Sequence, residues 1–152
     1  AGGTLAASVA LSAARDRVPV AWQLLIYPVT EVGADTPSRR AFGRGYYLDR
    51  DFIARADDSY LPDRATRNDP RISIAFADIP AGLAPAYLVT AGFDPLRDEG
   101  EAYAERMAEA GVEVEMVRFA GLIHGFVNIV GVGSSSRAAV DEIADRMRTA
   151  LS

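Results

Sequence analysis

The sequence predicts an α/β fold in which helices flank a mostly parallel sheet. Two continuous apolar runs, at 18–29 and 84–92, are typical of strands that are buried on both faces of a sheet. A third segment, 112–120, alternates apolar and polar residues, so we expect a strand with one exposed face towards the sheet edge. Helix-like segments alternate with these strands and cover 2–16, 95–111 and 134–151. Alternation of this kind is typical of parallel α/β sheets.

The three helical segments differ in their patterns. The first is rich in Ala and Leu and is apolar nearly all round, which predicts a buried helix. The second opens with Pro95 and acidic residues and closes at Gly111, which are helix start and stop signals. The last follows a run of serines that we expect to cap it, and its apolar spacing predicts one buried face.

Residues 30–83 interrupt the alternation and form an insertion. Turn-forming residues dominate most of it. The stretch LDRDFIARADDSYL, at 48–61, predicts one or two short helices with Asp49 or Asp51 as the cap. We therefore expect a single domain over 1–152 that carries this insertion.

The composition narrows the classes of partner. The chain has 152 residues, of which 49% are hydrophobic, as in a globular domain. The net charge of −5 and the lack of a basic stripe argue against nucleic acid or an anionic membrane as a partner. No cysteine is present, which excludes disulfides and thiolate chemistry and is compatible with the cytoplasm, where we expect the protein. No apolar run approaches the roughly 20 residues of a membrane span.

Two polar residues follow consecutive predicted strands. Asp94 comes directly after the run at 84–92, and His124, the only histidine, follows the strand at 112–120. Functional residues collect at the carboxyl ends of parallel strands, where an Asp can orient an imidazole and stabilise its cation. Two alternatives stay open: Asp94 is also suited to begin a helix before Pro95, and a single loop histidine is often structural.

Other kinds of site have less support in the sequence. Asp98 and Glu99 fall on the first turn of a predicted helix, where acids complement the helix dipole, so we expect no metal there. No Gly-x-Gly-x-x-Gly follows a strand, and no phosphate-binding loop ends in Gly-Lys-Ser/Thr. We expect no cofactor.

A histidine oriented by an aspartate needs a nucleophile, and the chain offers no suitable serine. None of its serines lies in a Gly-x-Ser-x-Gly turn between a strand and a helix. They are Ser8, Ser12, Ser38, Ser59, Ser73, Ser134, Ser135, Ser136 and Ser152. The search for a nucleophile therefore leads back to the first residues of the chain.

Three motifs together resemble a known family. The opening AGGTLAA resembles the segment after the nucleophile in bacterial hormone-sensitive-lipase-like carboxylesterases, whose nucleophile turn reads Gly-Asp-Ser-Ala-Gly-Gly. DPLRDEG, at 94–100, is similar to the acid motif of that family, and HGF, at 124–126, to its histidine motif. WQLLIYPV and the insertion also look like family segments, so the resemblance covers nearly the whole chain.

The resemblance implies the C-terminal portion of an α/β-hydrolase sheet, with 1–152 as a partial catalytic domain. Ala1 would directly follow the nucleophilic serine, which would lie upstream with the rest of the oxyanion hole. His124 would be the general base, Asp94 would orient it, and the Ala1 N–H would be one oxyanion donor.

The resemblance also implies where an ester would bind. The insertion at about 30–83, especially 38–62, would contribute to a cap over the acyl pocket. Its aromatic residues and the loop after the histidine supply pocket candidates, although the same aromatics would serve equally well to pack the insertion onto the sheet. The candidates are Phe42, Tyr46, Tyr47, Phe52, Tyr60, Phe126 and Val127.

The expected function is hydrolysis of carboxylic esters by a Ser-His-Asp mechanism. The alternative is a non-catalytic binding module of the same fold. The expected partners are a small-molecule ester and the upstream part of the same polypeptide, with a homo-oligomer possible and no nucleic acid or membrane. Residues 1–152 alone should be inactive, and the unpaired edge around AWQLLIY should promote self-association.

Overall fold

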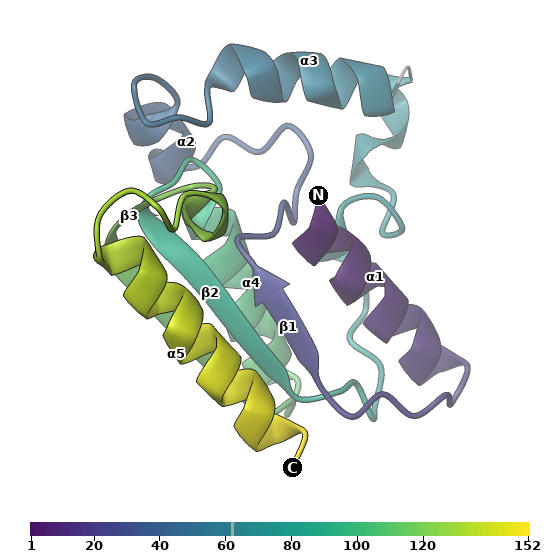
Figure 1. Cartoon of the computed structure of the whole chain (residues 1–152). Coiled ribbons are helices and arrows are strands. Elements are labelled where there is room, and N and C mark those ends of the chain that lie inside the picture. Colours follow the sequence, from purple (N-terminus) through teal and green to yellow (C-terminus); the bar gives the residue numbers. More distant parts are fainter. Residues whose placement is uncertain (62) are drawn as a thin grey trace.

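A three-stranded parallel sheet lies at the centre of the molecule (Figure 1). The computed structural model describes residues 1–61 and 63–152. The sheet consists of β1 (Gln23–Ile26), β2 (Ala86–Phe93) and β3 (Val114–Ile123), in the order β1-β2-β3. The predicted parallel α/β architecture is confirmed, including the position of the third strand at an edge of this sheet.

Helices cover both faces of the sheet. On one face, α1 (Gly2–Arg15) and α4 (Arg97–Glu109) share a buried cluster with Leu25 and Leu88. On the other face, α5 (Ser135–Ala150) packs Ala139 and Ile143 against side chains of β2. The cores of the two layers meet at β2, in which every residue before Phe93 is buried. This confirms that 84–92 contains a strand enclosed on both faces.

The first strand is much shorter than the apolar run that predicted it. Pairing with β2 begins at Gln23, opposite Ala86, and Val18 remains 56% exposed. Pro19 has no N–H for a sheet ladder, and Tyr27 turns the chain out of the strand with φ of 35° before Pro28. Only the middle of the run at 18–29 therefore forms a strand.

The first helix is buried on one side only in this chain, whereas its apolar pattern predicts enclosure by the sheet and neighbouring helices in a complete fold. Ala7, Ala10 and Leu11 are buried, but Leu5 is 59% and Val9 is 66% exposed. The sheet and its neighbours, within the described residues, contact only one side of α1. The other face of α1 is also apolar, but no described residue packs against it.

The part of the insertion that contains α2 (Pro37–Phe42) and α3 (Arg50–Tyr60) lies over the carboxyl ends of the strands (Figure 1). The insertion also contains two short turns, η1 (Arg64–Asn68) and η2 (Ile74–Phe76). Asp49 caps α3 by accepting a hydrogen bond from the Asp51 N–H, so the first of the two predicted caps is correct. Pro62, the last residue of the segment 38–62, lies outside the described residues.

A close approach of two backbones shapes the end of the sheet. The register between β2 and β3 shifts after Ala91, so that Phe93 pairs with Ile123. At this irregularity, a Cβ atom on Gly92 would lie 2.0 Å from the Ala120 carbonyl oxygen. Only glycine fits there without movement of the backbone, and the carboxyl ends of the two strands consequently stay side by side.

Two acidic residues of α4 attach the insertion to the sheet layer. Glu99 is buried, and its Oε1 accepts a hydrogen bond from the Thr30 N–H at 3.0 Å. Its Oε2 accepts from Arg39 Nε at 2.7 Å. Burial raises the pKa of Glu99, and the Arg39 guanidinium partly offsets that increase. The neighbouring Asp98 accepts from the Ser38 N–H at 2.7 Å.

These contacts extend the sequence interpretation of the two acids. Both do lie in the first turn of α4, as predicted. Their main partners, however, belong to the insertion, 60 or more residues earlier in the chain. The hydroxyl of Ser38 also donates to the Pro95 carbonyl at 2.8 Å, so α2 is fastened directly to the loop that carries Asp94.

Gly92→Ala is expected to lower stability by about 1–3 kcal/mol, the usual cost of forcing extra volume into a packed site. The added methyl group would collide with the Ala120 carbonyl, so the strand ends must separate. Thermal or denaturant unfolding measures the effect. Gly121→Ala is the matched control, since its Cβ would meet no atom within 4 Å. Equal stability of the two variants would contradict the close approach described here.

Arg39→Met should cost roughly 3–5 kcal/mol, because it leaves the buried Glu99 carboxylate without its cation. The comparison is Arg40→Met, which removes an exposed ion pair with Asp35 and should change stability by less than about 0.5 kcal/mol. Denaturant midpoints of the two variants provide the test. Similar midpoints would mean that backbone N–H groups alone satisfy Glu99.

Candidate active site

Asp94 is a fully buried carboxylate directly after β2. Its side chain has no exposed surface. Oδ1 accepts a hydrogen bond from the Leu96 N–H at 2.8 Å, and Oδ2 lies 2.8 Å from Nδ1 of His124. The two alternatives for Asp94 are therefore not exclusive: one oxygen closes the turn before α4, whereas the other meets the imidazole. The N-cap position of α4 itself is Leu96.

His124 follows β3 and faces Asp94 across the carboxyl ends of the strands. Its side chain is 17% exposed, so part of the ring reaches solvent. With an anionic Asp94 at Nδ1, that nitrogen carries the proton and Nε2 is left as the acceptor. Gly125 follows with φ of 82°, a conformation that favours glycine and reverses the chain immediately after the histidine. The His124 tautomer with its proton on Nδ1 and an acceptor at Nε2 is suited to a general base.

Tyr27 is a third residue at this site, and it was not among the candidates from the sequence. Its ring centroid lies 4.3 Å from that of His124, with the two planes tilted by 51°. Burial raises the pKa of Tyr27, and the Asp94 carboxylate adds to the increase. A signal was present in the sequence, because Tyr27 and Pro28 end the first apolar run at the same edge of the sheet.

Part of the predicted aromatic cluster lies beside these residues. Tyr46 stacks on Phe93, the last residue of β2, at 5.4 Å between ring centroids, and Phe42 packs edge-on against both. Tyr47 is 69% exposed with φ of 73°. A Cβ atom on Gly125 would lie 2.8 Å from its ring, so Tyr47 covers the residue next to His124.

The other pocket candidates lie elsewhere. Phe126 was expected to face a pocket, but it is completely buried among residues of β2, β3 and α5, because the turn at Gly125 directs it into the core. Val127 packs partly against the same cluster. Phe52 and Tyr60 belong to α3 and are 57% and 65% exposed, and among the described residues the ring contacts of Phe93 are with Phe42 and Tyr46.

The start of α1 lies at the same edge of the sheet. Thr4 donates a hydrogen bond to the Val29 carbonyl at 2.7 Å, and a Cβ atom on Gly3 would lie 2.9 Å from the Ile26 carbonyl oxygen. Ala1 is the N-cap residue of this helix. The positive end of the α1 dipole therefore lies next to the segment that carries Tyr27, as the arrangement in Figure 1 also shows.

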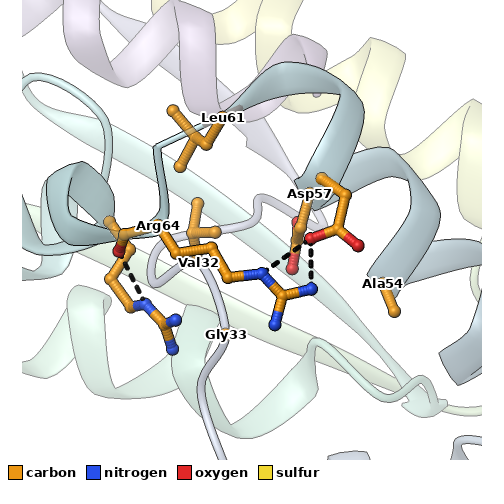
Figure 2. Close-up of a pocket in the computed structure, with 8 residues that line it drawn as sticks. Val32, Gly33, Ala54, Asp57, Leu61 and Arg64 are labelled. Atoms are coloured by element: carbon orange, nitrogen blue, oxygen red, sulfur yellow. Dashed lines mark hydrogen bonds and ion pairs between the residues drawn. The ribbon is translucent and has the colours of Figure 1, made fainter.

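Two cavities in the molecule are not lined by Asp94 or His124. The first, of about 170 Å³, lies beneath α3, and its wall includes Val32, Asp57 and Arg64, as Figure 2 shows. The second, of about 300 Å³, lies at the amino ends of the strands beside Trp22. Neither cavity is connected by its lining residues to the Asp94–His124 pair.

Among the described residues, 1–61 and 63–152, no group of three or more His, Cys, Asp or Glu side chains is placed to hold a metal ion. No helix in that part of the chain is long and apolar enough to cross a membrane.

Comparison with known proteins yields a consistent group of relatives. Residues 1–128 match the family described as the alpha/beta hydrolase fold. The chain is 41% identical, over its whole length, to the carboxylic ester hydrolase LipN of Mycobacterium tuberculosis, of which it covers 42%. It is 35% identical, over 84% of its length, to the ethyl acetate hydrolase of Pseudomonas putida, of which it covers 41%.

Solved structures agree with these relatives. An esterase from Pyrobaculum calidifontis superposes on 97% of this chain with a TM-score of 0.89 and 39% identity, and the match covers 50% of that protein. Carboxyl esterase 2 of Tuber melanosporum matches the whole chain with a TM-score of 0.92 and 29% identity, over 52% of its own length.

The chain thus spans about half the length of the proteins that it matches. The resemblance to bacterial carboxylesterases that its motifs indicated is confirmed at the level of the family. On the match over residues 1–128, this chain belongs to the alpha/beta hydrolase fold family.

Proposed function

We propose that the protein hydrolyses carboxylic esters by a Ser-His-Asp mechanism, in which this chain supplies the histidine and the aspartate. The observation that carries the proposal is the 2.8 Å contact between Asp94 Oδ2 and His124 Nδ1, with Asp94 fully buried. That arrangement orients an imidazole for base catalysis. Ester hydrolases among the relatives supply the reaction class. The nucleophilic serine is placed immediately upstream of Ala1, as the opening motif implies.

The proposed steps use His124 as a proton carrier. Nε2 takes the proton of the serine hydroxyl while the serine oxygen attacks the ester carbonyl, and Asp94 stabilises the imidazolium that results. The imidazolium then donates this proton to the leaving alcohol, and an acyl-enzyme remains. Water attacks the acyl-enzyme in the same way, which releases the acid and restores the serine.

The negative charge that develops on the carbonyl oxygen needs hydrogen-bond donors. We assign one of them to the N–H of Ala1, with the others upstream of this chain. The position of Ala1 at the start of α1 favours this assignment, because the positive end of a helix dipole stabilises an anion.

The aromatic residues beside the histidine are assigned to substrate contact. Tyr47 is exposed and covers Gly125, so an ester carbonyl that approaches His124 would pass its ring. Tyr46 contributes through its stack on Phe93, which lies next to Asp94 in the chain. Phe126 is left out of the pocket, since its side chain has no exposed surface.

His124→Ala is expected to abolish ester hydrolysis in the protein that contains this chain and its upstream serine. Asp94→Asn should leave the fold intact and lower kcat by about 10⁴, as a wrongly oriented tautomer does in serine hydrolases. Hydrolysis of p-nitrophenyl esters measures both effects, and labelling by a fluorophosphonate tests the serine.

Asp98→Asn serves as the matched control. Asp98 lies four residues beyond Asp94 but bonds to Ser38 and Arg97 and not to the imidazole, so its loss should reduce kcat far less. Equal losses in the two variants would contradict the assignment of Asp94. Absence of both labelling and hydrolysis in the parent protein would favour a binding module of the same fold.

A second prediction concerns residues 1–152 expressed alone. They should not hydrolyse p-nitrophenyl acetate or butyrate, because the proposed serine is not included. They should also self-associate, because β1 is an edge strand of the described sheet and Leu5, Val9 and Val18 are exposed beside it. Sedimentation and the ester assay test both points. Turnover that depends on His124 would show that another group in this chain is the nucleophile.

A further inference from the structure

We propose that Tyr27 is a positioning residue for His124: its ring holds the imidazole on Asp94 and stabilises the protonated form of that imidazole during turnover. The inference rests on the proposed function, since it assigns a role within the same site. It starts from the contact of the two rings, whose centroids lie 4.3 Å apart. Within the described residues, His124 forms its ring contact with Tyr27 and its hydrogen bond with Asp94.

The position of Tyr27 is determined by several independent contacts. Its N–H donates to the Val89 carbonyl at 2.8 Å, which anchors it to β2. Its ring packs edge-on against Phe126, at 5.5 Å between centroids, on the core side. Its φ of 35° is unusual for a residue with a side chain, and such a conformation persists only where the surroundings determine it. The ring is therefore a rigid surface beside the imidazole.

A rigid aromatic surface at this distance has two consequences. It limits rotation of the imidazole, so Nδ1 remains directed at Asp94 and Nε2 points away from it. It also attracts the imidazolium, because a cation within about 6 Å of a ring centroid interacts favourably with the ring. In the part of the chain that the structure describes, the ionisable groups placed around the imidazole are Asp94 at Nδ1, Tyr27 against the ring and Tyr47 beside Gly125.

The phenol itself is unsuited to act as a base. Burial and the Asp94 carboxylate both raise the pKa of Tyr27, so the hydroxyl stays protonated at neutral pH. The ring, and not the hydroxyl, is the part that acts on His124. This separation of ring from hydroxyl makes the role testable with conservative variants.

Tyr27 also lies between His124 and the start of α1, which the proposed serine would precede. The chain just before and just after it contacts the start of α1, where Gly3 lies against the Ile26 carbonyl and Thr4 donates a hydrogen bond to the Val29 carbonyl, two residues beyond Tyr27. The proposed nucleophile directly precedes that helix. One short segment therefore sets the position of the helix start and of the imidazole at the same time.

The test compares Tyr27→Phe, Tyr27→Leu and Tyr27→Met in the full-length protein. Tyr27→Phe keeps the ring and should stay within about twofold of the parent in kcat. Without the ring, kcat should fall roughly fivefold to tenfold with KM changed by less than about twofold, and the acid limb of the kcat/KM profile should move to lower pH by roughly half a unit to one unit. The direction follows because the protonated imidazole loses its stabilising neighbour.

A second measurement does not depend on activity. The Nδ1 proton of His124 should give a resolved downfield NMR signal in the parent and in Tyr27→Phe, identified by its loss in His124→Gln. In Tyr27→Leu and Tyr27→Met this signal should broaden through faster exchange with water. Trp22→Leu is the control, since it removes a ring at the other end of β1 that stacks on Tyr87 and should leave the signal unchanged.

The outcomes separate this inference from the proposed function. If the signal broadens in Tyr27→Leu and Tyr27→Met but the parent protein hydrolyses no ester, the contact is supported and the esterase proposal is contradicted. An unchanged signal in folded Tyr27→Leu and Tyr27→Met would overturn the inference, whatever the activity. Equal losses of kcat in Tyr27→Phe and Tyr27→Leu would overturn it too, because they would place the effect in the hydroxyl.

Discussion

The buried carboxylate of Asp94 is the constraint on which this edge of the fold depends. A carboxylate removed from water must be paired and hydrogen-bonded, or its burial is very costly. Here the donors are the Leu96 N–H, at the start of α4, and Nδ1 of His124, beyond β3. To satisfy one charge, the fold must bring the ends of two strands and the beginning of a helix together. The same requirement orients the imidazole, so stability and chemistry use one interaction.

A second buried carboxylate, that of Glu99, fixes the insertion to the sheet layer in the same way. Glu99 accepts hydrogen bonds from the Thr30 N–H and from Arg39, and the Ser38 hydroxyl donates one to the carbonyl of Pro95, next to Asp94. Because α2 is fastened in this way, Phe42 at its end meets Phe93 on β2. The aromatic cluster near His124 is therefore positioned by polar contacts several residues away. Movement of α2 would disturb the acid loop and the aromatic cluster together.

Much of the fold followed from local patterns, whereas several site residues did not. Alternating apolar runs and helix signals predicted the elements, and the rule for strand ends placed Asp94 beside His124. The partners of Glu99 lie 60 or more residues away, which no local pattern predicts. Phe126 was assigned to a pocket because it follows the histidine, but the reversal at Gly125 sends it into the core. The contact of Tyr27 depends on the packing of three segments.

The acid and base of the proposed triad are organised entirely within this chain. Asp94 and His124 are 30 residues apart, and the strands that carry them pair directly, with glycine at the closest approach. A separate set of contacts, through Gly3 and Thr4, places the start of α1 at the same edge. Neither set of contacts includes a serine, so the orientation of the acid and the base does not depend on the nucleophile. Catalysis by such a site would require only that the upstream turn deliver a hydroxyl to Nε2, with little reorganisation of the base.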